Sequence, residues 1–215
     1  MAQCGKPLYP AYLDLVDVRV LVVGGGAVAA RKAAGLLQAQ AAVTVVAPQF
    51  HRALMRLKCK RVKRGFRSGD LAGCRVVIVA TGDAGLNRRI AQAARRRGAL
   101  VNVAAPPEAG NLQVPAAVRR GPLCIAISTG GASSALAREC RKRLERLVSP
   151  EWGRLAEMLE QRRERIMKRV AEPAIRRRLL QRLGSLRWAA LIRTQGAREA
   201  GRRMDALIAK FALGS

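Results

Sequence analysis

A glycine-rich turn between residues 24 and 29 has the residue types and spacing of a phosphate-binding loop. Gly24, Gly26 and Ala29 fit the pattern G-x-G-x-x-A. The first glycine permits a tight turn, the second leaves room for a diphosphate, and the small third residue lets the following helix pack closely. We expect the diphosphate to lie over a helix N-terminus, near the amides of Ala27 and Val28. A tight turn with a purely structural role is the alternative.

A second turn, at residues 128–134, also combines backbone amides with hydroxyl groups. Its sequence is Ser-Thr-Gly-Gly-Ala-Ser-Ser, and it leads from an expected strand into an expected helix. Amides at a helix N-terminus, together with hydroxyls, can bind an anion. The same residues can instead form an ordinary helix cap through Ser133 or Ser134. The sequence leaves both interpretations open.

Metal and disulfide chemistry have little support in the sequence. His51 is the single histidine, and a surface or structural role is more common for such a residue than catalysis. The five cysteines are odd in number and no two have C-x-x-C spacing, so we expect neither a disulfide framework nor a zinc site. The densest charged run is basic, and we interpret it as a solvated face, with a nucleic-acid patch as the alternative. It comprises Arg56, Lys58, Lys60, Arg61, Lys63, Arg64 and Arg67.

The elements that must hold the glycine turn form a repeating strand–helix pattern. Residues 18–23 and 42–47 are almost continuous β-branched runs, as expected of strands buried on both faces of a parallel sheet. A helix over 30–38 joins them into a βαβ unit. The alternation continues with a weaker strand at 60–64, a strand at 76–80, a helix at 83–97 and a strand at 99–103. This pattern predicts an α/β fold of the Rossmann type, with a doubly wound parallel sheet.

The pattern changes after residue 104. Prolines and a glycine predict a loop at 104–110, and two short strands at 114–118 and 123–128 predict a hairpin. Helices are expected at 135–148, 152–170, 174–183 and 197–213. We therefore expect three regions, namely a nucleotide-binding domain at 1–113, a small β-hairpin and helix region at 114–149, and a helical domain at 150–215.

Composition and charge restrict the class of protein further. The chain has 215 residues, 50% of them hydrophobic, which excludes wholesale disorder, and a formal net charge of +27. Such a charge attracts nucleic acid, anionic lipid or a polycarboxylate small molecule, and an arginine-rich genomic bias is the alternative explanation. Aromatic residues make up only 3%, which is few for stacking single-stranded bases. No membrane span or signal peptide is recognisable, so we expect a cytoplasmic protein.

The end of the second expected strand leaves the choice of dinucleotide open. Residues 46–49, Val-Ala-Pro-Gln, contain no Asp or Glu that could bind the ribose hydroxyls of NAD. Arg52 and Arg56 follow closely and can either favour the 2′-phosphate of NADP or form solvated surface. NAD and NADP are therefore both candidates.

A series of short segments forms a recognisable set along the chain. They are Tyr9–Leu15, Val22–Lys32, Val45–Pro48, Val79–Asp83, Leu86–Asn87, Val101–Val103, Val114–Ala116, Arg120–Leu123, Ser128–Gly131, Leu136–Arg138 and Leu144–Glu145. In this order and spacing they resemble the siroheme synthase family, in its stand-alone or amino-terminal module form. The module is a precorrin-2 dehydrogenase and, in some members, also a sirohydrochlorin ferrochelatase. Beyond residue 150 the chain is similar to the family's third region in character only.

The resemblance implies an activity and a set of ligands. It implies NAD-dependent oxidation of precorrin-2 to sirohydrochlorin by a homodimer, with 114–149 as the dimerisation region. The dinucleotide would then be bound by Gly24, Gly26, Ala27, Val28, Pro48, Gln49 and Thr81. The tetrapyrrole would be bound by Asn102, Ser128, Thr129, Gly130 and Gly131. Its eight carboxylates make sense of part of the basic charge. Neither a resident metal nor a nucleic-acid partner is expected.

One position departs from the family pattern. The family has an Asp, implicated in both dehydrogenation and metal insertion, where this chain has Ala105. Asp83 and Glu108 are possible substitutes. We expect dehydrogenation to survive, because hydride transfer depends mainly on the cofactor, and metal insertion to be lost, because the pyrrole nitrogens must give up protons. A tetrapyrrole-binding protein without catalysis, and a basic nucleic-acid-binding protein on a Rossmann scaffold, are the alternatives.

Overall fold

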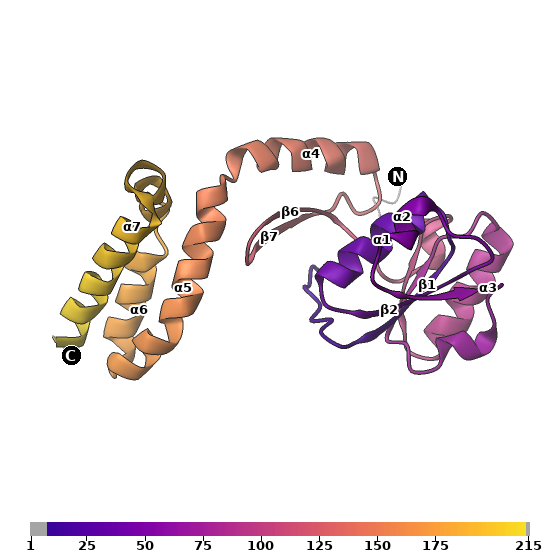
Figure 1. Ribbon diagram of the computed structural model, residues 1–215, viewed down its shortest axis with the longest axis horizontal. Coiled ribbons are helices and arrows are strands. Elements are labelled where there is room, and N and C mark those ends of the chain that lie inside the picture. The colour runs from indigo at the N-terminus through magenta and orange to yellow at the C-terminus, as the bar shows by residue number, and fades with distance from the viewer. Residues whose placement is uncertain (1–7, 214–215) are drawn as a thin grey trace, which may run out of the picture. The chain divides into compact units, whose positions relative to one another are not determined.

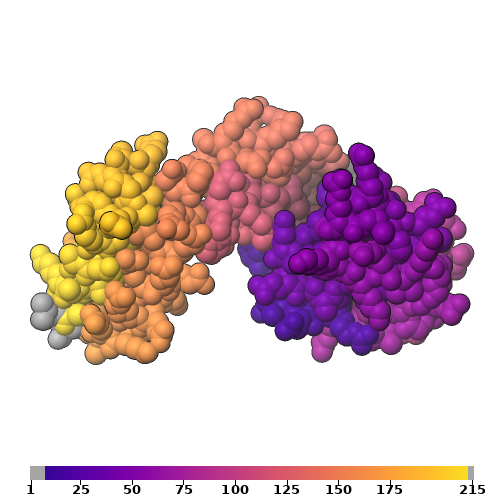
Figure 2. All heavy atoms as spheres, viewed as in Figure 1, coloured from indigo at the N-terminus to yellow at the C-terminus, as the bar shows by residue number. Residues whose placement is uncertain are grey.

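The computed structural model describes residues 8–213, which form two compact units divided between Val114 and Pro115. The first unit runs from indigo to magenta and the second from salmon to yellow (Figures 1 and 2). The hairpin and the C-terminal helices belong to the same unit, and the expected separation of 114–149 from 150–215 stays a prediction. None of the helices within residues 8–213 is both long and apolar enough to cross a membrane.

The first unit is built on a five-stranded parallel sheet, which confirms the predicted fold class. Its strands are β1 (Arg19–Val23), β2 (Ala42–Ala47), β3 (Lys60–Lys63), β4 (Val76–Val79) and β5 (Leu100–Val103). Their order in the sheet is β3-β2-β1-β4-β5, so the chain winds outward from β1 in both directions. In the centre, Val22 lies in register between Val45 and Ile78. All three are buried, because helices cover both faces of the sheet.

Each face of the sheet has its own hydrophobic core. Helix α1 (Ala27–Gln38) packs Ala29, Ala30 and Ala33 against β1 and β4 on one face. Helix α3 (Ala84–Arg96) packs Ile90 and Ala94 on the other face. Ala29, the third residue of the glycine pattern, is 0% exposed, because its small side chain lets α1 approach the sheet closely. Three short elements connect the rest: α2 (Arg52–Met55), η1 (Ser68–Leu71) and η2 (Pro107–Ala109).

The second unit combines an antiparallel hairpin with four helices. Its elements are β6 (Ala116–Arg120), β7 (Leu123–Ile127), α4 (Ser134–Leu147), α5 (Pro150–Arg169), α6 (Pro173–Leu183) and α7 (Arg187–Leu213). Met158, Leu179 and Met204 bring three of the helices, α5, α6 and α7, into one shared core. Pro150 and Pro173 each occupy the first turn of a helix, where the missing amide hydrogen costs nothing.

Helix α7 is longer than predicted. We expected a helix over 197–213, whereas the structure has helix from Arg187, interrupted at Gly196 with φ 83° and ψ 161°. That backbone conformation is accessible essentially only to glycine. Residues 187–195 therefore form a separate arm, which is held by Ala189 and Ile192 in the shared core.

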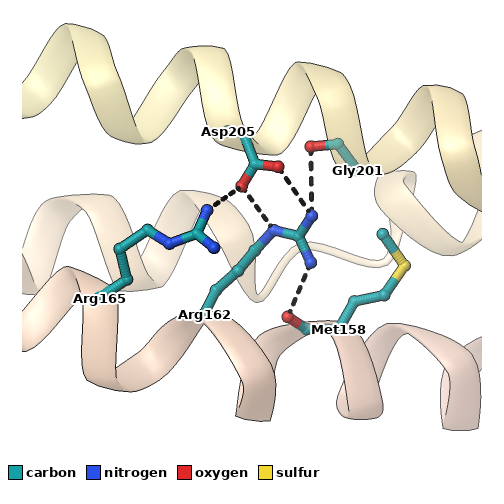
Figure 3. Close-up of polar contacts among 5 residues, drawn as sticks. All are labelled: Met158, Arg162, Arg165, Gly201 and Asp205. Atoms are coloured by element: carbon teal, nitrogen blue, oxygen red, sulfur yellow. Dashed lines mark hydrogen bonds and ion pairs between the residues drawn. The ribbon is translucent and has the colours of Figure 1, made fainter.

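An arginine on α5 joins that helix to the second arm of α7, residues 197–213 (Figure 3). Arg162 donates from Nε to Oδ1 of Asp205 (2.9 Å) and from Nη2 to Oδ2 of the same carboxylate (3.0 Å). It also donates to the backbone oxygens of Met158 and Gly201. The Arg162 side chain is only 13% exposed, and Arg165 adds a hydrogen bond to Asp205 from the next helical turn. A bidentate pair of this kind fixes both the distance and the rotation of the two helices.

Candidate functional site

A pocket of about 680 Å³ opens where the chain leaves the carboxyl ends of β1, β2 and β4. The glycine turn forms one side, the segment after β2 forms a second, and the segment after β4 forms a third. The order of strands reverses between β1 and β4, and this reversal is the place where open α/β sheets bind their ligands. The volume lies within the range of small-molecule and cofactor sites.

Two of the three glycines are required by the crowding around the turn. Gly24 has a φ of +125°, and a Cβ there would lie 2.2 Å from the carbonyl oxygen of Ala80. A Cβ on Gly25 would lie 1.8 Å from the carbonyl oxygen of Gln49. The turn is tied to its neighbours by backbone bonds, one from Gly24 N to Val46 O (3.0 Å) and one from His51 N to Gly25 O (2.7 Å). These two glycines therefore let the turn fit between the ends of β2 and β4.

Gly26 differs, because the space in front of it is open. A Cβ on Gly26 would meet no atom within 4 Å. Gly26 is also the N-cap of α1, and it offers no side chain to accept the amides of the first helical turn. The amides of Ala27 and Val28 thus begin a helix whose N-terminus faces an open space at the pocket. This arrangement fits the diphosphate of a dinucleotide.

The wall after β2 is largely apolar and carries no carboxylate. It includes Pro48, Gln49 and Phe50, and Phe66 from the segment after β3 lies in the same lining. His51 also lines the pocket, but its Nδ1 accepts the amide of Ala53 (3.2 Å) and caps α2, which is a structural role. Neither Arg52 nor Arg56 is among the lining residues, although both follow this wall in sequence.

The wall after β4 is held by a buried amide that the sequence prediction did not identify as a site residue. Asn87 is 1% exposed, and its Oδ1 accepts a hydrogen bond from Thr81 Oγ1 (2.6 Å). Its Nδ2 donates to the backbone oxygens of Thr81 (3.2 Å) and Ala105 (2.7 Å). Asn87 therefore connects Thr81, which lines the pocket, with the segment after β5 that carries Ala105. The sequence did contain a signal for this role, because Asn87 is a polar residue on the buried face of the expected helix.

The two possible substitute carboxylates have different surroundings. Asp83 lines the pocket, and its Oδ1 accepts the amide of Leu86 (2.9 Å), so it is the N-cap of α3. Glu108 is not among the lining residues; it lies 3.8 Å from Arg88, and both side chains are more than half exposed. Of the two, only Asp83 faces the pocket. Its carboxylate is already engaged in stabilising the helix.

Asn102 is the second buried polar residue of the described chain. It is 8% exposed, its Nδ2 donates to the Leu112 oxygen (2.9 Å), and its Oδ1 is buried without a hydrogen-bond partner among the described residues. Ala105, three residues further, is exposed, and only its backbone oxygen is held. A direct contact between Asn102 and substrate stays a prediction.

The turn at 128–134 lies in the second unit and caps its own helix. Ser133 Oγ accepts the amide of Leu136 (3.1 Å), as the capping interpretation predicted. Thr129 Oγ1 accepts the amide of Ser133 and donates to its carbonyl oxygen. Gly130 and Gly131 both have positive φ, which lets the chain fold back over these hydroxyls. Contact of this turn with a tetrapyrrole stays a prediction.

Part of the basic run is structural. Arg61 donates to the backbone oxygens of Leu54 and Leu57, and Arg64 forms a bidentate pair with Asp70 (2.8 and 2.6 Å). This hydrogen-bonded pair holds the pKa of Asp70 below its usual value. Within residues 8–213, no group of three or more His, Cys, Asp or Glu side chains is placed to hold a metal ion.

The sheet and its pocket define the chain as a Rossmann-type nucleotide-binding protein, and comparison with known proteins narrows this class. Residues 11–116 match the family described as putative NAD(P)-binding. Residues 120–147 match the family described as the central part of the sirohaem biosynthesis protein. Together these matches follow the same order as the segments that resemble the siroheme synthase family.

Similar proteins agree with these matches. The siroheme synthase of Methylococcus capsulatus is 41% identical over 181 residues, which is 80% of this chain and 37% of that protein. That of Nitrosospira multiformis is 40% identical over 182 residues, 81% of this chain and 39% of that protein. A solved structure, "SirC, precorrin-2 dehydrogenase", superposes with a TM-score of 0.75 at 28% identity, covering 93% of this chain and all of that one. The chain belongs to the siroheme synthase family, and it spans less than two-fifths of the length of these two siroheme synthases.

Proposed function

We propose that this protein is a precorrin-2 dehydrogenase that oxidises precorrin-2 to sirohydrochlorin and passes the hydride to NAD. The observation that carries the proposal is the open N-terminus of α1 at Gly26, on a pocket at the switch point of the sheet. The likeness to a solved protein that is named a precorrin-2 dehydrogenase supports the same reaction.

The residues around the pocket have separate tasks in this proposal. Gly24 and Gly26 let the dinucleotide approach, and the amides of Ala27 and Val28 bind its diphosphate. Pro48 and Gln49 on one wall and Thr81 on the other orient the rest of the cofactor. When bound, NAD supplies the chemistry by accepting a hydride.

The pocket supports NAD rather than NADP. A 2′-phosphate is usually bound by an arginine near the end of the second strand. Arg52 and Arg56 are both exposed and do not line the pocket, and Gln49 is neutral. Comparing the Michaelis constants for the two dinucleotides tests this choice, and a clear preference for NADP would contradict it.

The substrate is expected to contact the second unit, and the protein is expected to act as a homodimer. Precorrin-2 carries many carboxylates, which suit a chain with a net charge of +27. Ser128, Thr129, Gly130 and Gly131 are the residues of the second unit proposed for this contact. Asn102 is proposed as a substrate contact of the first unit. Sedimentation at micromolar concentration tests the dimer.

The activity is tested by mixing the purified chain with precorrin-2 and NAD under anaerobic conditions and following the absorbance of NADH. We expect NADH to form in step with sirohydrochlorin. Without a positioned base the rate is expected to be lower by about 100- to 10,000-fold than with one, because the proton must leave to water or to a substrate carboxylate. Tight binding of sirohydrochlorin without any NADH would instead support a non-catalytic tetrapyrrole-binding protein.

Metal insertion is proposed to be absent, because alanine can neither accept a proton nor contact a metal. Ala105 is exposed and its backbone is fixed by Asn87, so a larger side chain meets no packing obstacle. We predict that Ala105→Asp raises iron insertion into sirohydrochlorin by roughly 100-fold or more. Ala104→Asp, one residue away and also exposed, is the matched control and should change little. Iron insertion at an ordinary rate by the unmodified chain would contradict the proposal.

A further inference from the structure

A groove of about 630 Å³ lies within the helical unit, between the two arms of α7. Its apolar lining includes Trp188 and Leu191 from the first arm and Leu207 from the second. All three are partly exposed, although each packs against the shared core. Trp188 Nε1 donates to the backbone oxygen of Arg182 (2.9 Å), and this bond fixes the orientation of the indole ring. The groove thus offers an apolar surface with an ordered indole ring.

All the charged residues that line this groove are basic. Arg182, Arg187, Arg203 and Lys210 line it, and no acidic residue does. Arg203 is partly neutralised by Glu199 Oε1 (2.7 Å), whereas Arg182 lies over the ring of Phe211 at 5.6 Å. Neither Arg187 nor Lys210 forms an ion pair with any carboxylate of residues 8–213. Like charges gathered around one groove repel each other, so an anionic ligand would relieve that repulsion.

We propose that this groove is a second binding site for the acidic macrocycle, located on the helical unit and separate from the dinucleotide pocket. The proposal rests on the proposed function for the identity of the ligand. A tetrapyrrole has a flat apolar body with carboxylates at its edge, and the groove combines apolar side chains, among them the indole of Trp188, with four exposed cations. Its volume is that of a small-molecule site.

Two other anionic partners fit the groove less well. A single-stranded nucleic acid needs several aromatic side chains on which successive bases can stack, and the lining of this groove has one. An acidic amphipathic helix needs an apolar track long enough for anchors at i, i+3, i+4 and i+7. The lining of this groove has three large apolar side chains, those of Trp188, Leu191 and Leu207.

Trp188 provides a direct test, because the chain has only two tryptophans. In the Trp152→Phe variant, Trp188 is the single fluorophore, and titration with uroporphyrin, a stable octacarboxylate porphyrin, should quench its emission to saturation. In the Trp188→Phe variant, Trp152 lies outside the groove lining and should be quenched far less. Equal quenching of both tryptophans would overturn the proposal, because it would show that the bound porphyrin lies no closer to Trp188 than to Trp152.

Charge reversal tests the rim. The double variant Arg187→Glu/Lys210→Glu should weaken uroporphyrin binding by about tenfold or more, because two attractive contacts become repulsive. The matched control Arg177→Glu/Arg178→Glu changes the net charge equally but places both charges on the exposed surface of α6, outside the groove. It should weaken binding by less than about threefold. If Trp152→Phe does not fold, the two charge-reversed pairs are compared in the chain that keeps both tryptophans.

The outcomes separate this proposal from the proposed function. NADH formation from precorrin-2 without quenching of Trp188 would contradict the proposed groove site and support the proposed dehydrogenase activity. Quenching of Trp188 without NADH formation would support the groove as a binding site and contradict the proposed dehydrogenase activity. Two further results would overturn the proposal by showing that the groove binds polyanions in general. One is equal weakening of uroporphyrin binding by both charge-reversed pairs. The other is binding of polyglutamate or of a single-stranded oligonucleotide as tightly as uroporphyrin.

Discussion

At the scale of single residues, Gly26 is the position where cofactor binding can be separated from folding. Its φ is −79°, which any residue adopts, and a Cβ would meet no protein atom. We predict that Gly26→Ala changes the free energy of unfolding by less than about 1 kcal/mol. It should nevertheless weaken NADH binding by about tenfold or more, because the methyl group occupies the approach of the diphosphate. Urea denaturation and fluorescence titration with NADH measure the two effects.

Gly35 provides the control for this substitution. It lies in the last turn of α1, is exposed, and has open space where a Cβ would stand. Gly35→Ala should stabilise the helix by about 0.5–1 kcal/mol and leave the affinity for NADH unchanged. Equal losses of NADH affinity in both variants would show that Gly26 acts through the stability of α1 rather than through contact.

The residues of the candidate site differ in how far the sequence could predict them. The glycine turn was predictable, because its spacing between a strand and a helix is a local property. The role of Asn87 was not, because its partner Ala105 is 18 residues away and the contact depends on helix α3 meeting the segment after β5. The cap formed by Ser133 was predicted only as one of two possibilities, because capping and anion binding use the same residue types.

At the scale of elements, the pair between Arg162 and Asp205 decides how α5 and α7 pack. Asp205→Ala leaves a mostly buried guanidinium with only two backbone oxygens as partners. We predict a loss of about 1–2 kcal/mol in the free energy of unfolding, measured by urea denaturation. Arg165→Ala removes a single exposed contact to the same carboxylate and should cost less than about 0.5 kcal/mol. Similar losses in both variants would contradict the assigned role of Arg162.

The end of β3 is predicted to be sensitive to acid. The hydrogen bond from Arg64 lowers the pKa of Asp70 in the folded state, so the carboxylate is stabilised there relative to the unfolded chain. This stabilisation is complete above the ordinary aspartate pKa of about 3.9 and is lost as the pH falls through the lower folded value. Asp70→Asn should therefore have a lower urea midpoint than the unmodified chain at pH 7. The difference should shrink towards pH 3, and a constant difference would refute the assignment.

Among the elements, long and strongly patterned ones were predictable. The β-branched runs predicted the bounds of four of the strands to within about one residue. Burial on both faces of the sheet leaves little choice of residue type in such strands. The arm at 187–195 was missed, because Gly184 and Gly196 bracket it and its stability comes from packing against α5 and α6. Tertiary packing of that kind is not visible in a local pattern.

At the scale of the whole molecule, the net charge of +27 opposes the folded state. Compact folding brings 41 basic side chains close together with 14 acidic ones. Salt screens repulsion between exposed charges, so raising NaCl from about 50 to 500 mM should raise the melting temperature by about 2–4 °C, or roughly 1 kcal/mol for a chain of this size. A flat or falling melting temperature would show that ion pairs outweigh the repulsion.

The hydrogen bond from Asn87 to the backbone oxygen of Ala105 bears on which side chains position 105 can carry. It holds the main chain at position 105 through a carbonyl oxygen, and that bond is indifferent to the side chain carried there. Codons for alanine and aspartate can differ by a single base. Exchange of the alanine for an acid would thus need neither a new loop shape nor compensating changes elsewhere, because the bond that fixes the loop does not involve the side chain.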